Sequence, residues 1–318
     1  MSNFSKLAAA FAVLALCSCS GRYEIVSGYA QGGVYSVKYN SRGAKLSHAE
    51  IRRGIESILD SIDRSLSGYN AASTLSRYNA GERRYDDPLF DTALGMAEEY
   101  YALSDGAVDC WSAPLFDLWG FGFSGDGSEI PSDAQLGEAR EECARRTRVN
   151  FNSFAQGLSC DIVASYLRDA GVEDMLVDIG EIYCCGLNPK GKGWTIAVDN
   201  PVDGNNSPGA DIRAIWSSDG RACGIVTSGN YRKFYVRDSV KYSHTIDPRS
   251  GKPVEHSLLS ATVVAPSAAL ADAMATFCMV SGPEEARKRI LAEPEMEALL
   301  ISSDGVWTSP GFNIISQE

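Results

Sequence analysis

Hydrophobic and polar positions alternate along residues 23–40, which predicts two β-strands joined at the sequence AQGGVY. From residue 47 to residue 66 the pattern changes to a helical period, with one apolar stripe on an otherwise polar segment. The stripe consists of Ile51, Ile55, Ile58, Leu59, Ile62 and Leu66. Ser47 and Glu50 have the spacing of a capping box, so we expect the helix to begin directly after Ser47.

Further helices are predicted in the first half of the chain. Pro88 is typical of a first helical position, and the apolar spacing after it predicts a helix to about Ser104. Helical patterns return at about 133–146 and 156–170. Residues 105–131 are rich in Gly, Trp and Phe, which predicts a loop with little regular structure.

The second half of the chain is predicted to consist mainly of short strands. The candidate strands are MLVDIGEIYCCGL, WTIAVDN, IRAIWSS, GRACGIVTS, YRKFYVR and LSATVVA. Two helices, at about 267–282 and 283–293, interrupt them before a final strand at about 298–305. This order favours the α+β class, with one domain over residues 23–318 in which mixed or antiparallel sheets are flanked by helices.

The start of the chain is typical of a targeting segment. Lys6 precedes an apolar run at residues 7–16, which fits a secretory signal peptide and is too short to span a bilayer as a mature helix. The run ends in LCSC, which resembles a bacterial lipobox. We therefore expect residues 1–18 to be a signal peptide of the lipoprotein type.

Cys19 is the expected site of acylation, with residues 19–22 as a short tether to the membrane. The protein is then an exported lipoprotein that faces the periplasm. Cys17 is a competing acceptor, although the bulky Leu16 precedes it, and an ordinary cleaved signal peptide is the alternative.

Charge limits the class of partner. The formal net charge is −12, and no run of Lys or Arg interrupts it. Sequence-independent binding to nucleic acid requires a basic surface, so nucleic acid is not an expected partner. An anionic small substrate would need a metal ion or backbone N–H groups to offset this charge.

Seven cysteines follow the leader, and an odd number leaves at least one of them unpaired within the chain. They are Cys110, Cys143, Cys160, Cys184, Cys185, Cys223 and Cys278. None has C-x-x-C spacing, which argues against zinc, and most are expected to be buried small side chains. Cys184 and Cys185 are predicted to face opposite sides of a strand.

One predicted helix carries oxygen donors on a single face. Asp272 and Thr276 are four residues apart, and the alanines around them leave room for a ligand or another backbone. A carboxylate and a hydroxyl suit Mg²⁺ better than zinc. The alternative is a surface Asp with a Thr that bonds back to its own helix.

Three other segments contain candidate chemistry. NFNSFAQGLSCD, at 150–161, places amides at a predicted helix start, where they could hold a phosphate or simply cap the helix. The aromatic segment 104–122 is either core or the wall of a pocket for a flat ligand. KYSHTIDPRSGKP, at 241–253, holds His244, one of three histidines, in what is otherwise ordinary turn chemistry.

Together these motifs resemble the FAD:protein FMN transferase family of the ApbE type. The resemblance rests on eight segments in family order: QGGVYSVKY, SGYNAASTLSRYN, GAVD with APLFDLWGFG, FAQG, DIGEI, TSGNY, SHTIDPRSGKP and ADAMAT. They cover essentially all of the chain after the leader. The resemblance implies the ApbE fold, which is similar to the T-fold.

The resemblance also implies an activity: Mg²⁺-dependent transfer of FMN from FAD to a Ser or Thr hydroxyl of a target protein, with release of AMP. The implied target is an exported or membrane redox protein, such as a subunit of a Na⁺-pumping NADH:quinone reductase or a related electron-transfer complex. By position, the implied FAD contacts are Gln31, Tyr69, Ala107, Val108, Asp109, Asn150, Gln156 and Ile246. The implied Mg²⁺ ligands are Asp272, Thr276 and the carbonyl of Ser153.

His244 resembles the family histidine beside the scissile pyrophosphate. With an unperturbed pKa of about 6.5 it suits a general base, and Asp247 either fixes its tautomer or takes the proton itself. Arg249 follows in the same turn.

The chain departs from the family pattern at several positions. One glycine, Gly180, stands where the family has two, and Gln156 replaces a commoner lysine. The remaining departures are Val108, Asn150 and Asn230. Two other functions stay open on the same site, an FAD pyrophosphatase that gives FMN and AMP, and a flavin-binding lipoprotein without catalysis.

Overall fold

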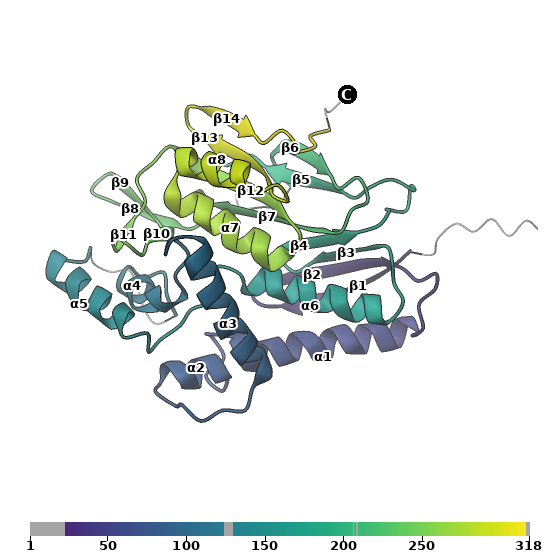
Figure 1. The fold of residues 1–318 in the computed structure, drawn as a ribbon, viewed down its shortest axis with the longest axis horizontal. Helices are drawn as coiled ribbons and strands as arrows, with labels where there is room; N and C mark the ends of the chain where they lie inside the picture. Colours follow the sequence, from purple (N-terminus) through teal and green to yellow (C-terminus); the bar gives the residue numbers. More distant parts are fainter. Residues whose placement is uncertain (1–22, 124–129, 206, 208, 316–318) are drawn as a thin grey trace, which may run out of the picture.

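The protein is built on an eight-stranded sheet whose neighbouring strands are all antiparallel. The computed structural model describes residues 23–123, 130–205, 207 and 209–315 (Figure 1). The strands follow the order β1 (Tyr23–Ala30), β2 (Gly33–Asn40), β3 (Met175–Asp178), β4 (Ile182–Cys185), β7 (Cys223–Gly229), β12 (Leu258–Ala265), β13 (Glu297–Ser302) and β14 (Gly305–Thr308). The expected α+β class is confirmed.

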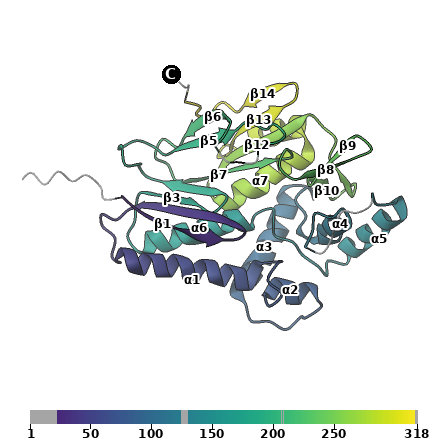
Figure 2. The ribbon, with the colours of Figure 1, turned by 180° about the vertical axis from the view of Figure 1, so that it is seen from behind.

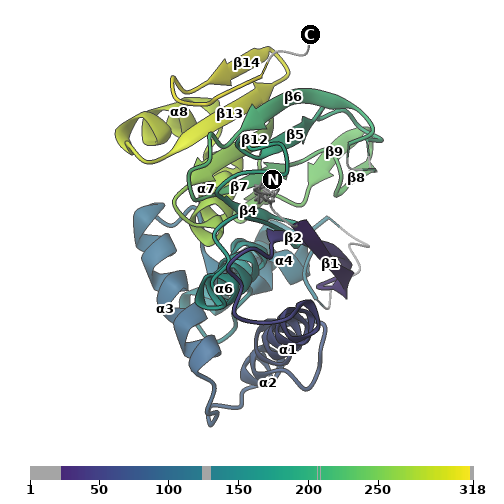
Figure 3. The same cartoon turned by 90° about the vertical axis from the view of Figure 1, so that its right-hand side faces the viewer.

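Helices cover one face of this sheet. Helix α6 (Ala155–Asp169) packs on β3 and β4, α7 (Ala268–Ser281) packs on β7 and β12, and α8 (Pro283–Ala292) packs on β13. Helix α1 (His48–Leu66) lies outside α6, and Figure 3 shows it nearly end-on beside that helix. Figure 2 shows the same layers from behind.

The opposite face of the sheet is covered by the hairpin β5 (Thr195–Asp199) and β6 (Ile212–Ser217). Successive residues of a strand face opposite sides, so Val226 joins the core under the helices while Ile225 joins the core under this hairpin. Trp216 is fully buried in the second core. The two cores together bury the central strands on both faces.

The predicted first helix is confirmed with its cap. The Ser47 hydroxyl accepts the Glu50 amide, and the Glu50 carboxylate accepts the Ser47 amide. Five of the six stripe residues are buried. Ile58 is partly buried and packs against two hydrophobic clusters on the helix side of the sheet. Helix α3 (Pro88–Leu103) begins at Pro88 as predicted, with Asp87 as its N-cap.

Several boundaries differ from the sequence prediction. The predicted loop 105–131 contains the 3-10 helix η1 (Cys110–Ser112) and helix α4 (Ala113–Leu118), because Pro114 and the apolar residues after it pack into the interior. A short helix α2 (Thr74–Asn79) was not predicted. The segment MLVDIGEIYCCGL forms two strands, because residues 179–181 turn the chain between β3 and β4.

A lateral group of small elements completes the domain. It contains α4, α5 (Asp133–Ala144), the hairpin β8 (Phe234–Arg237) with β9 (Val240–Ser243), and the hairpin β10 (Ile246–Asp247) with β11 (Lys252–Pro253) (Figure 1). Leu115, Trp119 and Ile246 share a small core there. Among the described residues, no helix is long and apolar enough to cross a membrane. The expected leader, Cys19 and the tether lie outside the described residues.

Candidate active site

The candidate metal ligands lie where the start of helix α6 meets helix α7. Asp272 is 5% exposed, and its Oδ2 accepts a hydrogen bond of 3.2 Å from the backbone amide of Gly157. That amide is one of the first N–H groups of α6, which have no partner inside the helix. Asp272 of α7 therefore caps the N-terminus of α6.

Asp161 of α6 makes the reciprocal contact. Its two carboxylate oxygens accept the amides of Ala268 and Ala269, at 2.8 and 2.9 Å, at the start of α7. The two helices approach closely because residue 157 is glycine, since a Cβ there would lie 2.3 Å from the Ala268 carbonyl oxygen. The sequence interpretation that small residues allow a close backbone approach is confirmed.

Thr276 follows Asp272 by one helical turn and is partly exposed on the same helix. Ser153 lies just before α6, and its hydroxyl is 3.7 Å from the Cys110 sulfur. Asn150 joins the same loop, because its amide donates to the Cys110 carbonyl at 2.8 Å. The fold thus brings Ser153 and Asn150 to the end of α6 that Asp272 caps.

The charges at this point fit a cation. Burial, opposed by the hydrogen bond from the Gly157 amide and assisted by the charge of Asp161, raises the pKa of Asp272 to about 7. Among the ion pairs of the described residues, none involves Asp272. A buried carboxylate without a basic partner is unfavourable unless another positive charge is present.

A second carboxylate increases the negative charge. Glu181 ends the turn between β3 and β4, and its pKa is raised well above the usual range, first by burial and then by the charge of Asp272. Sequence reasoning did not assign a role to Glu181 or Asp161, although both stand in motifs that it singled out. Only the fold shows that they lie beside Asp272.

The donor set is suited to a hard cation. Within the described part of the chain, no group of three or more His, Cys, Asp or Glu side chains is placed to hold a metal ion. The oxygen donors of Asp272, Thr276 and Ser153 fit a cation such as Mg²⁺, which binds through few protein carboxylates and completes its shell with substrate phosphate and water. The residues present therefore fit the expected metal.

Two glutamines predicted to contact FAD lie at α6: Gln31 packs against the helix, and Gln156 stands in its first turn. Gln31 sits at the tip of the β1–β2 hairpin with φ 52°, and its Nε2 donates to Ser159 Oγ at 2.6 Å. Gln156 Nε2 donates to the Ile179 carbonyl at 3.5 Å. A Cβ on Gly180 would lie 2.7 Å from that nitrogen, and Gly180 has φ +93°, so the one glycine kept in DIGEI occupies the position that requires it.

The other residues predicted to contact FAD range from fully buried to largely exposed. Ala107, Val108 and Ile246 are about 1% exposed, so their side chains belong to the core, and a contact of these residues with FAD stays a prediction. Asp109 caps η1 by accepting the Trp111 amide, and burial raises its pKa. Tyr69 is 78% exposed in the loop between α1 and α2.

His244 lies between β9 and β10, where its ring is held by the backbone. Its Nδ1 is 3.1 Å from the Lys233 carbonyl, which makes Nδ1 the protonated nitrogen and leaves Nε2 as the acceptor. Burial, and then the positive charge of Lys233, lower the pKa of His244 to about 4. The unperturbed pKa of about 6.5 expected from the sequence is therefore too high for His244 in this fold.

Asp247 is directed toward Arg249. Its Oδ1 accepts the Arg249 Nε at 2.8 Å and the Arg249 amide at 2.9 Å. The contact that sets the His244 tautomer here is with the Lys233 carbonyl. A role for Asp247 as proton acceptor stays a prediction.

The aromatic segment links these groups, and its tryptophans belong to the core. Trp111 and Trp119 are buried, whereas Phe121 packs edge-on against His244, with 6.3 Å between ring centroids. Phe123 packs edge-on against Tyr69 at 5.1 Å. The segment thus connects the loop of Tyr69 with the turn of His244, and β10 in that turn also contacts α7.

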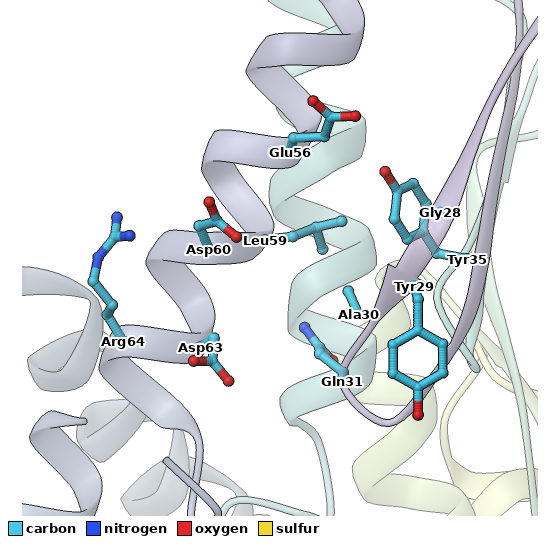
Figure 4. Close-up of a pocket in the computed structure, with 10 residues that line it drawn as sticks. All are labelled: Gly28, Tyr29, Ala30, Gln31, Tyr35, Glu56, Leu59, Asp60, Asp63 and Arg64. Atoms are coloured by element: carbon cyan, nitrogen blue, oxygen red, sulfur yellow. The ribbon is translucent and has the colours of Figure 1, made fainter. Parts of the chain in front are cut away.

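A pocket of about 450 Å³ lies between the β1–β2 hairpin and α1 (Figure 4). Gln31 stands at the hairpin tip, and Glu56, Asp60 and Asp63 line the α1 side. The Arg64 guanidinium also lines the pocket, so three carboxylates and one cation leave it with a net negative charge that disfavours a pyrophosphate.

The sequence and the fold have known relatives. The ApbE family matches residues 32–300. The chain is 31% identical to an FAD:protein FMN transferase of Escherichia coli K12, over 91% of this chain and 88% of that protein. It is 30% identical to one of Vibrio cholerae, over 89% of each.

Solved structures agree with this result. The flavin transferase ApbE of Vibrio cholerae superimposes with a TM-score of 0.79 at 29% identity, covering 92% of this chain and 98% of that one. The flavinyl transferase ApbE of Pseudomonas stutzeri gives a TM-score of 0.79 at 31% identity, over 91% and 95%. The fold is that of the ApbE flavin transferases. The chain belongs to the ApbE family.

Proposed function

We propose that this protein transfers FMN from FAD to a hydroxyl group of another protein and releases AMP. The curated relatives carry the name FAD:protein FMN transferase and align along most of their length. The observation that carries the proposal is the buried Asp272 at the start of α6, a carboxylate without a basic partner among the described ion pairs and beside neutral oxygen donors.

Asp272, Thr276 and the carbonyl of Ser153 would hold Mg²⁺ there. When bound, the ion supplies Lewis-acid stabilisation to the phosphate oxygens on which negative charge develops. The carboxylates of Asp272 and Glu181 provide the negative charge that attracts the cation.

His244 is placed to accept the proton of the attacking hydroxyl. The Ser or Thr oxygen of the target bonds to the phosphorus on the FMN side of the pyrophosphate, and the bond to the AMP oxygen breaks. The proton passes to Nε2 of His244, because Nδ1 is already bonded to the Lys233 carbonyl. Asp247 is the alternative acceptor of that proton.

Gln31, Asn150 and Gln156 are the polar side chains proposed to orient FAD. All three are anchored around the start of α6, which keeps the pyrophosphate next to Asp272. Phe121 and the His244 turn provide an apolar wall for a flat ring. Tyr69 is proposed to cover the ligand from its exposed loop.

The acceptor is proposed to be an exported or membrane redox protein. The basis is the leader, in which a signal peptide at 1–18 and an acylated Cys19 would place the enzyme at the periplasmic side of a membrane. A subunit of a Na⁺-pumping NADH:quinone reductase or a related electron-transfer complex is the type of target implied.

One assay tests the activity against its two alternatives. The mature protein is incubated with FAD and Mg²⁺, with and without a Ser/Thr-containing peptide from a candidate acceptor. We expect a flavinylated peptide and an equal amount of AMP. FMN and AMP without peptide labelling would indicate a pyrophosphatase, and FAD that stays intact would indicate a flavin carrier.

A further inference from the structure

Two cysteines face each other across the centre of the sheet. Cys184 of β4 and Cys223 of β7 are directly paired in the antiparallel register, and their sulfur atoms are 3.8 Å apart. Both side chains enter the core beneath the β5–β6 hairpin. We propose that Cys184 and Cys223 form a disulfide bond in the mature protein, a modification that does not depend on the proposed transferase activity.

The geometry requires only a small movement. A disulfide needs sulfur atoms about 2.0 Å apart on backbones that are already close, as they are in a directly paired position of two neighbouring strands. Closure from 3.8 Å is within the range of side-chain rotation. The backbone of the sheet does not have to move.

The other cysteines are placed differently. Cys185 faces the opposite side of β4 and packs against the core of α1 and α6, which confirms the predicted alternation. Cys110 contacts the Ser153 hydroxyl, and the Cys160 thiol donates to the Glu181 carbonyl. Their sulfur contacts are to oxygen, so they are not the partners of a disulfide here.

Cys223 attacks first in the exchange, while the chain folds and its sulfur is still accessible. In the folded sheet, the hydrogen bond with Cys184 and the Arg221 guanidinium lower the pKa of the Cys223 thiol, against the effect of burial. Its thiolate attacks an external disulfide, from a protein or a small molecule, and one thiol leaves. The Cys184 thiolate then attacks the sulfur of Cys223 in this mixed disulfide, and the second thiol leaves.

The reaction balances as a two-electron exchange. The cysteine pair loses two protons and two electrons, and the external disulfide takes them up as two thiols. Cys184 is 0% exposed and Cys223 is 2% exposed, so the bond is expected to form while the exported chain folds, before the sheet closes over both sulfurs.

The bond would fix strands that support the candidate active site. Strand β4 directly follows Glu181, and Gly224 of β7 packs so closely on α7 that a Cβ there would lie 2.3 Å from Ala268 Cα. A link between β4 and β7 therefore holds the turn of Glu181 in register with the strand beneath the Asp272 helix. The expected consequence is a higher melting temperature.

The thiol state of the full-length protein, recovered from its exporting compartment, tests the proposal. The sample is denatured and alkylated with N-ethylmaleimide without reductant, and its peptides are mapped by mass spectrometry. We expect a linked Cys184–Cys223 peptide and alkylation of the other five described cysteines. Alkylated Cys184 and Cys223, both in this sample and after refolding with oxidised glutathione, would overturn the proposal, as would a Cys185–Cys223 link.

Variants and a melting curve complete the test. Cys185→Ser is the matched control and keeps the linked peptide, whereas Cys184→Ser loses it and leaves Cys223 alkylated. Reductant is expected to lower the melting temperature of the wild type on the order of 10 °C and to leave Cys184→Ser unaffected. A wild-type melting temperature that is the same for protein unfolded and refolded with reductant and for protein never exposed to reductant contradicts the proposal without relying on any variant.

Discussion

Asp272 and Asp161 cap each other's helices: Asp272 of α7 accepts an amide of α6, and Asp161 of α6 accepts two amides of α7. This exchange fixes the two N-termini side by side and buries the Asp272 carboxylate between them. The same contact that builds the fold therefore creates the concentrated negative charge to which we assign the metal.

The close approach of the two helices gives a first prediction. Gly157→Ala should reduce the free energy of unfolding by about 1–3 kcal/mol, because the added Cβ would lie 2.3 Å from the Ala268 carbonyl oxygen. Gly137→Ala, in α5 with nothing near its Cβ, should instead stabilise by about 0.5–1 kcal/mol. Denaturant titration of both variants measures the difference, and equal effects would contradict the packing argument.

Metal affinity should depend on pH near neutrality. Mg²⁺ binds the ionised carboxylate, and the pKa of Asp272 is raised to about 7, so protons compete with the metal below that pH. We expect the dissociation constant to rise about tenfold for each pH unit below 7 and to level off above it. Calorimetric titration between pH 5.5 and pH 8.5 measures this.

A second variant checks the cause of that dependence. Asp161→Asn removes a neighbouring negative charge that raises the pKa of Asp272, while its single amide oxygen can still accept one of the two α7 amides. The transition should therefore move to lower pH. A Mg²⁺ affinity independent of pH in the wild type would place the metal on another group.

His244 should act without titrating at neutral pH. Its pKa is lowered to about 4, so the ring is already neutral above about pH 5 and no loss of turnover near pH 6.5 is expected at saturating Mg²⁺. His244→Ala should lower kcat by about 10²–10⁴. His48→Ala, at the start of α1, is the control and should keep wild-type kcat. If His244→Ala changes only the affinity for FAD, the residue is a ligand contact and not the base.

The anchor is tested by fractionation. Cys19→Ala should release the protein from membranes, because burial of acyl chains contributes about 0.8 kcal/mol per CH₂ and the variant cannot be acylated. Cys17→Ala should remain bound. Retention of Cys19→Ala in the membrane fraction, or a mature N-terminus at Cys17, would show that the anchor is assigned to the wrong residue.

Local signals predicted much of the fold. The apolar stripe and capping box of α1 and the Pro88 start of α3 depend on residues a few positions apart, so the sequence contains them directly. The hairpin β3–β4 was merged into one strand because its turn residue Ile179 is apolar and buried, like the strands around it. Helix α4 was not predicted, because it lies in a Gly- and aromatic-rich segment whose structure depends on packing with the rest of the protein and not on a local pattern.

The sequence predicted which residues form the candidate site, but not their burial or the neighbours that surround them. Asp272 and Thr276 share a helix, so their common face follows from spacing alone. The partners of these groups are remote in sequence: Asp161 and Glu181 for Asp272, and the Lys233 carbonyl for His244. Burial and these neighbours set the pKa values, which is why an ordinary pKa was predicted for His244 from the sequence.

The most direct measurement of the central claim is transfer by Asp272→Asn. Asparagine can still accept the Gly157 amide, so the fold is kept while the negative charge is removed. At low millimolar Mg²⁺ we expect wild-type protein, and an Asp169→Asn control at the exposed end of α6, to produce flavinylated acceptor and AMP in equal amounts. Asp272→Asn should produce neither and should lose calorimetric Mg²⁺ binding. Wild-type rates from Asp272→Asn would contradict the account.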